Sequence, residues 1–195
     1  MTIKTTRLLL RPLEMSDAPD IQRLAGDKDV ASTTLNIEHP YEDGMAEKWI
    51  TSCQKMADSG ELINFAITLQ TDGNFLGAIG IHFQETEGHA EIGYWVGKPY
   101  WNRGYASEAA KAVVEYGFTE LSLDRIYAAH FTRNPASGRV LKNAGMLYEG
   151  SQLGPTIKWG NMEQLELYGV SRKQLLESQS TQKQTKIPSP SQGEG

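Results

Sequence analysis

Disulfides, membrane spans and a secretory signal are the features that this 195-residue sequence lacks. Its single cysteine, Cys53, excludes an internal disulfide framework and a cysteine-based structural zinc site. Its longest apolar run, residues 75–81, is far shorter than the roughly 20 residues that cross a bilayer. The N-terminus is too polar for a secretory signal. These absences predict a soluble, cytoplasmic protein with no membrane partner.

The chain also lacks an excess of positive charge. It has 19 lysines and arginines against 24 aspartates and glutamates and a pI of about 5.4, whereas a nucleic-acid binder typically has a high pI and a continuous basic face. The charge is uneven, because residues 1–97 carry 7 basic and 15 acidic side chains and residues 98–142 carry 7 and 4. The basic middle indicates an anionic ligand rather than nucleic acid, although uneven surface charge without a ligand would look the same.

Apolar periodicity over residues 1–177 predicts one mixed α and β domain with the element order βααβββαβαββ. The expected strands are residues 7–13, 61–70, 75–84, 90–97, 125–131, 146–153 and 162–170, and the expected helices are residues 16–26, 41–59, 104–120 and 134–145. Asp72-Gly73 predicts a hairpin between the second and third strands. Residues 178–195 are polar, with Ile187 as their one aliphatic or aromatic residue, and we expect a disordered tail there.

The most informative segment is residues 90–106, AEIGYWVGKPYWNRGYA, in which an apolar strand leads through a loop into an amphipathic helix. The first N–H groups of a helix lack intrahelical partners and carry the positive end of its dipole, so they suit a phosphate. Gly104 would let the backbone approach that phosphate, Ala106 would keep the next contact small, and Arg103 would add charge. A purely structural turn would also use such a glycine, and neither a P-loop nor a GxGxxG motif is present.

Four segments together resemble the GNAT superfamily of acyl-CoA N-acyltransferases, and within it the ribosomal-protein N-terminal acetyltransferase-like (RimJ/RimL-type) branch. They are TTRLLLRPLEMSDA, AEIGYWV, WNRGYASEA and NPASGRVLKNAGM, and the resemblance covers residues 5–172. The family loop is usually Gln/Arg-x-x-Gly-x-Gly/Ala, and here Trp101 takes the first place while Gly104 and Ala106 take the others. The resemblance implies an α+β fold with a mostly antiparallel, twisted sheet of about seven strands flanked by helices.

The same resemblance implies that acetyl-CoA is the cosubstrate and that the strand before the loop separates from its neighbour. The pantetheine arm would bind the backbone of Tyr94, Trp95 and Val96, and Asn134 would orient it while also capping a helix. The side chains of Trp95 and Val96 are interpreted as core. The diphosphate would bind backbone N–H groups of Trp101, Asn102, Arg103, Gly104, Tyr105, Ala106 and Ser107.

Transfer of an acyl group to an amine requires a base for the amine and a donor for the oxyanion. Glu91 is the candidate base, directly or through water, and a backbone N–H near Val96 is the candidate oxyanion donor. A carboxylate is a weak base unless burial raises its pKa, and Glu91 is otherwise a solvated strand residue. His82 or His89 are alternative bases, although both read more simply as structural or surface residues. The histidines show no metal-ligand spacing, so no metal is expected.

The departing thiolate requires a proton source. Ser137 matches the serine that the resembling branch uses as the acid, and its alternative role is that of a hydroxyl at the start of a helix. The tyrosine that other members of the superfamily use falls at Leu141, so this chain lacks that acid.

These observations predict an enzyme that transfers the acetyl group of acetyl-CoA directly to a primary amine in a ternary complex. A non-catalytic acyl-CoA-binding or sensing module and an O-acyltransferase are the alternatives. The acidic first half favours a cationic acceptor, such as a protein N-terminal α-amine, a polyamine, an aminoglycoside or a small amino compound. Tyr41, Trp49 and Tyr94 would line an acceptor pocket or belong to the core, and Cys53 is expected in the core. We expect a monomer or a homodimer.

Overall fold

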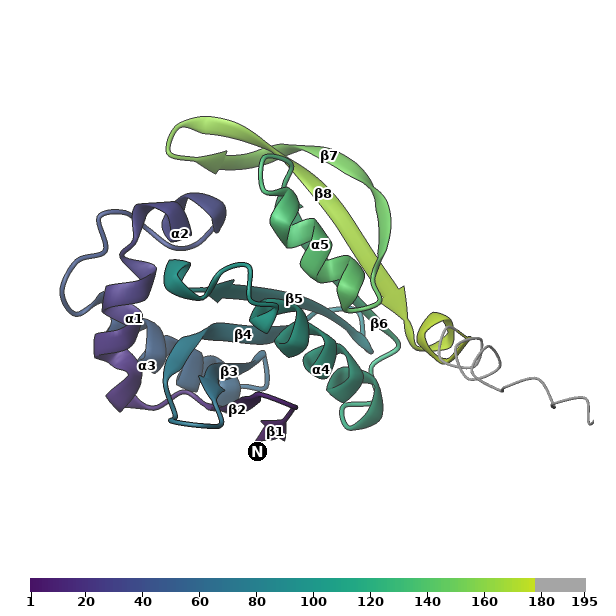
Figure 1. The fold of residues 1–195 in the computed structure, drawn as a ribbon. Coiled ribbons are helices and arrows are strands. Elements are labelled where there is room, and N and C mark those ends of the chain that lie inside the picture. The colour runs from purple at the N-terminus through teal and green to yellow at the C-terminus, as the bar shows by residue number, and fades with distance from the viewer. Residues whose placement is uncertain (178–195) are drawn as a thin grey trace, which may run out of the picture.

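The sheet at the centre of the protein has eight strands in the order β1-β2-β3-β4-β5-β6-β8-β7 (Figure 1). In this computed structural model, which describes residues 1–177, the strands are β1 (Ile3–Lys4), β2 (Leu8–Pro12), β3 (Leu62–Leu69), β4 (Phe75–Phe83), β5 (His89–Val96), β6 (Arg125–Phe131), β7 (Leu147–Lys158) and β8 (Asn161–Ser171). Every neighbouring pair is antiparallel except β5 and β6, which are parallel. The mostly antiparallel sheet flanked by helices is therefore confirmed.

Among residues 1–177, the α-helices that accompany the sheet are α1 (Ala18–Ala25), α2 (Lys28–Thr33), α3 (Met45–Asp58), α4 (Tyr105–Thr119) and α5 (Pro135–Asn143), and residues 172–177 are helical as well. Two short 3-10 turns, Met15–Asp17 and Lys98–Tyr100, precede α1 and α4. Figure 1 shows α4 and α5 together on one face of the sheet, and α1 and α3 towards the other side of its β3–β4 part. Each pair of helices packs on one face of the sheet, and an apolar cluster lies between that pair and the sheet.

The larger cluster lies between the sheet and α4 with α5. The expected apolar stripe of α4 is buried there, including Val113, Val114 and Phe118, and it packs on Phe65, Ile79, Ile92 and Ile126. Gly117 belongs to this stripe because a side chain would meet the Ile126 Cδ1 atom at 2.7 Å. The 3.6-residue period therefore predicted this helix and its buried face correctly.

The smaller cluster joins α1 and α3 to the opposite face of the sheet. Ile21, Leu24 and Ile50 are buried against Ala66 and Phe75. Cys53 lies in this cluster with 6% exposure, and its Sγ atom accepts a hydrogen bond from the Asn64 amide at 3.2 Å. The expectation of a core thiol is confirmed.

Several boundaries differ from the sequence-based expectation. The second expected helix begins at Met45 rather than at residue 41, because Gly44 has the left-handed φ of 82° just before it. Strand β1 and helix α2 were not predicted. β1 has 2 residues and α2 has 6, so neither is long enough to show a periodic pattern of apolar residues.

The last two strands form a much longer hairpin than predicted. β7 continues to Lys158 and pairs with β8 through a two-residue turn at Trp159 and Gly160, whose φ values are 50° and 81°. Two positive φ values are typical of the type I′ turn that joins twisted strands. The expected strands ended at residue 153 and resumed at residue 162, and Gly154 and Pro155, which are residue types typical of turns, lie between them. Figure 1 shows this hairpin curving beside and above α5.

The polar segment 178–195, predicted to be a disordered tail, lies outside the described residues. In the part of the chain that the structure describes, no helix has the length and apolar character needed to cross a membrane.

Candidate active site

The central feature of the site is a gap in the sheet between β5 and β6. The two strands pair only through His89–Arg125, Ala90–Ile126 and Glu91–Tyr127, although β5 continues to Val96 and β6 to Phe131. Beyond Glu91 the two strands are unpaired with each other, whereas β5 stays paired with β4 and β6 with β8. The separation of strands implied by the resemblance is therefore present at the expected strand.

The register of β4 and β5 decides which backbone groups face this gap. The hydrogen bonds Gly97 N to Leu76 O (2.8 Å) and Gln84 N to His89 O (3.1 Å) lie at the two ends of the ladder and fix its alternation. Residues 91, 93 and 95 consequently direct their N–H and C=O groups to β4, and residues 92, 94 and 96 direct theirs to the gap. Tyr94 and Val96 fit the backbone role predicted for them, whereas the Trp95 backbone faces β4.

The expected phosphate loop lies at the N-terminus of α4. Gly104 has a φ of 79°, and a Cβ atom built on it would meet only the Arg7 Nη2 atom, at 3.4 Å, so this side of the backbone is open. The first intrahelical hydrogen bond is Glu108 N to Gly104 O, so the N–H groups of Tyr105, Ala106 and Ser107 precede the helical ladder. Asn102, Arg103 and Gly104 are exposed. This arrangement fits the diphosphate of acetyl-CoA.

Trp101 differs from its predicted role in this loop. Its backbone N–H donates to Lys98 O at 3.2 Å, and its indole Nε1 donates to Val96 O at 2.6 Å. Both donors are therefore already used inside the protein. Trp101 ties the loop to the end of β5, and the donors that remain for a phosphate begin at Asn102.

Arg7, between β1 and β2, contacts the loop, and nothing in the sequence indicated this contact. Its Nη1 atom donates to Arg103 O at 3.0 Å, and its guanidinium carbon lies 4.6 Å from the centre of the Tyr105 ring. Its Nε atom also pairs with Glu108 at 2.7 Å. Arg7 lies in one of the four quoted segments, but nothing local in the sequence shows that it contacts α4.

The candidate acid, Ser137, lies in the first turn of α5. Asn134 is the N-cap of this helix, and its side chain accepts from Ser137 N at 3.4 Å. The Ser137 hydroxyl does not cap the helix; it lies 2.7 Å from the Tyr94 hydroxyl. Leu141 is fully buried in the larger apolar cluster.

The candidate base, Glu91, lies just before the gap opens and on the opposite face of the sheet from Tyr94, since side chains alternate along a strand. His82 and Tyr127 are its direct neighbours on β4 and β6 and share its face. Burial raises the pKa of Glu91 and lowers that of His82. Burial, together with the Glu91 charge, raises the pKa of Tyr127. Partial burial moves the Glu91 pKa in the direction that a general base needs.

The remaining aromatic and histidine residues considered for the site are packed or buried inside the protein. Trp49 packs edge-on against Trp95, with ring centres 6.5 Å apart, and burial raises the pKa of Tyr41 to about 12. His130 is buried with its Nδ1 atom 2.8 Å from Phe131 O. Among residues 1–177, no group of three or more His, Cys, Asp and Glu side chains is arranged to hold a metal ion.

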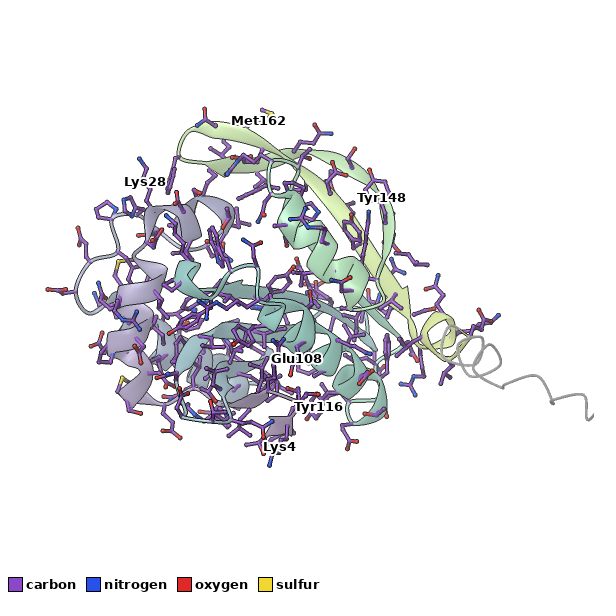
Figure 2. All side chains as sticks on the ribbon, in the orientation of Figure 1. Lys4, Lys28, Glu108, Tyr116, Tyr148 and Met162 are labelled. Carbon is purple, nitrogen blue, oxygen red and sulfur yellow. The ribbon has the colours of Figure 1, made fainter. Side chains whose placement is uncertain are left out.

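The β7–β8 hairpin reaches across to the segment after α2. Ile37 of that segment packs on the smaller apolar cluster together with Trp95, whose side chain is on the same face of β5 as that of Glu91. Lys158 is 5% exposed, and its ammonium donates to Leu35 O at 3.2 Å and to Ile37 O at 2.5 Å. Arg133 donates to Ser32 O at 2.6 Å and pairs with Glu163 at 2.8 Å. In Figure 2, Met162 on the hairpin and Lys28 on α2 lie at the same end of the molecule. The sequence showed no sign of these contacts.

Comparison with known proteins agrees with this geometry. The Acetyltransferase (GNAT) domain family matches residues 7–147 of the chain. The curated protein "Uncharacterized N-acetyltransferase p20" of Bacillus licheniformis is 33% identical over 151 residues, which cover 76% of this chain and 84% of that protein. "Uncharacterized N-acetyltransferase YnaD" of Bacillus subtilis is 36% identical over 151 residues, with 77% and 85% covered.

A solved structure of a GNAT-family acetyltransferase from Bacillus anthracis is also similar. It is 28% identical to this chain, superposes with a TM-score of 0.78, and the match covers 89% of this chain and 99% of that one. The chain therefore belongs to the GNAT family of acetyltransferases, which makes it an acetyl-CoA-dependent N-acetyltransferase, as the sequence predicted.

Proposed function

We propose that this enzyme acetylates a cationic primary amine in a ternary complex, with Glu91 as the base and Ser137 as the acid. The observation that carries the proposal is the gap between β5 and β6, which opens directly after Glu91 and is lined on the other face by Tyr94 and Ser137. An opening through the sheet lets one reacting centre be approached from both faces. The amine would arrive from the Glu91 face, and the thioester would lie along the gap.

Two sets of backbone groups would hold acetyl-CoA. The N–H groups from Asn102 to Ser107 suit its diphosphate, and the gap-facing groups of Tyr94 and Val96 suit the amides of its pantetheine arm. Asn134, at the end of the loop after β6, would orient that arm from the opposite side of the gap. Acetyl-CoA supplies the activated acetyl group, and the chain supplies its position.

The transfer proceeds by attack of the amine nitrogen on the thioester carbon. Glu91, directly or through water, accepts the proton that the ammonium must lose, and the Val96 N–H donates to the oxygen that becomes negative. The nitrogen then loses a second proton to solvent, the carbon–sulfur bond breaks as the carbonyl re-forms, and Ser137 donates a proton to the sulfur. The serine afterwards regains a proton from solvent. A thiol pKa of about 8.5 makes the thiolate a tolerable leaving group, so the serine contributes a moderate part of the rate.

The class of amine that accepts the acetyl group is not fixed by the fold. Proteins that share this fold act on different amines: a ribosomal L7/L12 α-N-protein acetyltransferase (RimL) has a TM-score of 0.80 at 17% identity, and the spermidine N-acetyltransferase of Vibrio cholerae, solved with CoA and spermine, has 0.74 at 20%. Identities this low carry the fold alone. The acidic residues of the first half of the chain support a positively charged acceptor, either a protein N-terminus or a small cationic amine.

The test is a screen for acetyl transfer with three classes of acceptor: peptides with a free N-terminus, polyamines and amino acids. Release of free CoA and a mass increase of one acetyl group on the same acceptor would support the proposal. The matched control is each peptide with its α-amine blocked and a serine hydroxyl free. CoA binding without turnover on any amine would instead support the non-catalytic binding module, and transfer to the blocked peptide would support O-acylation.

The proposal also covers the location, the oligomeric state and the domain boundary of the enzyme. We place it in the cytoplasm as a monomer or homodimer whose domain ends near residue 177, in keeping with the single cysteine and the polar segment that follows. Cell fractionation and light scattering of the purified full chain would test location and oligomeric state.

A further inference from the structure

The hydroxyl of Tyr94 makes a contact that bridges the gap in the sheet. It lies 2.7 Å from Ser137 Oγ and 3.2 Å from Ser137 O, and the two residues are 43 positions apart. Tyr94 belongs to β5, and Ser137 belongs to α5, which follows β6. Because β5 and β6 are unpaired at this level, the contact joins the two sides where the backbone does not.

The first turn of α5 is also seated closely on the sheet below it. A Cβ atom at Gly138 would meet the His130 Nε2 atom at 2.7 Å and the Tyr168 hydroxyl at 3.1 Å, so only glycine allows the helix to lie at this height. Asn134 holds the Ser137 N–H. The Ser137 backbone is thus positioned by Asn134 and Gly138, and the remaining freedom of its side chain is the rotation of its hydroxyl group about χ1.

The hydrogen atoms of the two hydroxyls can be arranged in two ways. When Tyr94 donates to Ser137 O, the serine donates its own proton to Tyr94. When Tyr94 donates to Ser137 Oγ, the serine proton is free for a third atom, and the serine oxygen carries an extra hydrogen bond. Burial raises the pKa of Tyr94 far above its usual value, so the phenol keeps its proton at any physiological pH.

We infer that Tyr94 is a positioning residue, which holds the Ser137 hydroxyl at the gap and, by donating to its oxygen, frees the serine proton for the departing sulfur. This inference rests on the proposed function, because it gives Tyr94 a role only through Ser137. Tyr94 itself loses no proton and forms no bond to the substrate.

A double-mutant cycle tests the coupling. Tyr94→Phe keeps the ring and removes the hydroxyl, and it should lower kcat about tenfold while leaving the acetyl-CoA KM within about twofold. In a Ser137→Ala background the same change should have no further effect on kcat, because the group that it positions is already gone. Tyr116→Phe is the matched control, since Tyr116 lies near the other end of α4 and packs on Phe65. It should leave kcat unchanged.

A second measurement needs no turnover. Free CoA bound to the enzyme has a thiol whose ionisation can be followed by the ultraviolet absorbance of the thiolate. A hydrogen bond donated by Ser137 favours the thiolate, so the wild-type protein should lower the thiol pKa. Tyr94→Phe should raise it, Ser137→Ala should raise it further, and the double variant should match Ser137→Ala, with melting temperatures that show folded protein in each case.

Different failures have different meanings. Equal loss of kcat from Tyr94→Phe with and without Ser137, or an unchanged thiol pKa in Tyr94→Phe, would overturn the positioning role. If Tyr94→Phe does not fold, Gly138→Ala decides, since raising the α5 turn should reduce kcat in the presence of Ser137 and have no effect in its absence. A wild-type protein that binds CoA and shifts its thiol pKa but acetylates no amine would contradict the proposed function and leave the positioning role intact.

Discussion

Glu108 in the first turn of α4 is joined to Arg7, which follows β1, by a pair of hydrogen bonds: Arg7 Nε to Glu108 Oε2 at 2.7 Å and Arg7 N to Glu108 Oε1 at 2.8 Å. Thr5 adds a third at 2.6 Å. Burial alone would raise the Glu108 pKa, but these donors outweigh it and lower the pKa. A negative charge so close to the expected phosphate site would repel an anion, and the guanidinium of Arg7 offsets it. Figure 2 shows Glu108 on α4 on the same side of the molecule as Lys4 of β1.

Arg7→Ala should therefore weaken acetyl-CoA binding. It removes the donor to Arg103 O and leaves the Glu108 charge near the loop, so the acetyl-CoA KM should rise roughly tenfold, which corresponds to about 1.4 kcal/mol. The free energy of unfolding should fall by about 1 kcal/mol, because the pair is partly exposed. Arg23→Ala is the matched control, since its pair with Asp20 is a surface contact within α1. An unchanged acetyl-CoA KM in a folded Arg7→Ala protein would show that the contact of Arg7 with the loop does not contribute to acetyl-CoA binding.

Gly104→Val should reduce acetyl-CoA affinity for two reasons that a control can separate. A left-handed φ of 79° is unfavourable for any side chain by roughly 1–2 kcal/mol, and the new side chain also covers the phosphate loop. Gly73→Val shares the first effect, with a φ of 74° and open space around it, but lies in the β3–β4 turn. Thermal unfolding should show a loss for both variants, and steady-state kinetics should show a higher acetyl-CoA KM for Gly104→Val alone. Equal KM values would contradict the assignment of the phosphate loop.

Ser137→Ala should lower kcat by about 10²-fold, the low end of the range for general acid–base catalysis, because water can also protonate a thiolate. Since the Asn134 side chain caps α5, the expected loss of stability is only about 1 kcal/mol, from the bond to Tyr94. Kinetics and melting temperature are measured on the same protein, with Ser16→Ala, an exposed serine before α1, as the control. A destabilised Ser137→Ala variant with full turnover would refute the role as acid.

Glu91→Gln should abolish the rising, acidic limb of the profile of kcat/KM against pH. The wild-type kcat/KM should rise with pH through the raised pKa of Glu91 as the carboxylate forms, and the amide variant should lack this rise. The exposed Glu87→Gln provides the control. A profile that keeps the same limb in Glu91→Gln would assign the base to water or to another group.

The same substitution carries a prediction for stability. Because the folded-state pKa of Glu91 is raised above its unfolded value, the folded protein binds this proton more tightly, and stability is lost as pH rises through the raised pKa. Glu91→Gln should therefore have a higher melting temperature than the wild type at neutral pH and a similar one in acid. A lower melting temperature at neutral pH would show that the carboxylate is stabilised by contacts other than those described.

Lys158→Met should weaken binding of the amine acceptor. The variant keeps most of the apolar stem and removes the ammonium that joins the β7–β8 hairpin to Leu35 O and Ile37 O. We expect a higher acceptor KM with an unchanged acetyl-CoA KM, because the phosphate loop lies elsewhere. Lys48→Met, at an exposed position on α3, is the control. A change in the acetyl-CoA KM alone would show that the hairpin does not border the acceptor site.

Local sequence was sufficient for the elements with a clear period or turn signal. The apolar stripe of α4, the hairpin at Asp72-Gly73 and the capping residue Asn134 depend on residues within a few positions of one another, so they could be predicted without tertiary contacts. The gap beside β5 was expected from the family resemblance, but the register that directs the backbone of Tyr94 and Val96 to the gap and that of Trp95 to β4 was not predicted. The roles of Glu91 and Ser137 in catalysis stay predictions.

The remaining features depend on where distant segments meet. Arg7 contacts Glu108 across 101 positions, Tyr94 contacts Ser137 across 43, and Lys158 contacts Leu35 across 123. Such contacts depend on the twist of the sheet, the seating of α5 on Gly138 and the two-residue turn at Trp159-Gly160, none of which leaves a periodic pattern in the chain. The sequence by itself determined the longer helices and strands and the glycine turn that opens α4, because these follow from short-range sterics and apolar periodicity. Only the tertiary structure decided which side chains contact that turn and the Ser137 hydroxyl, because their partners are brought together by packing.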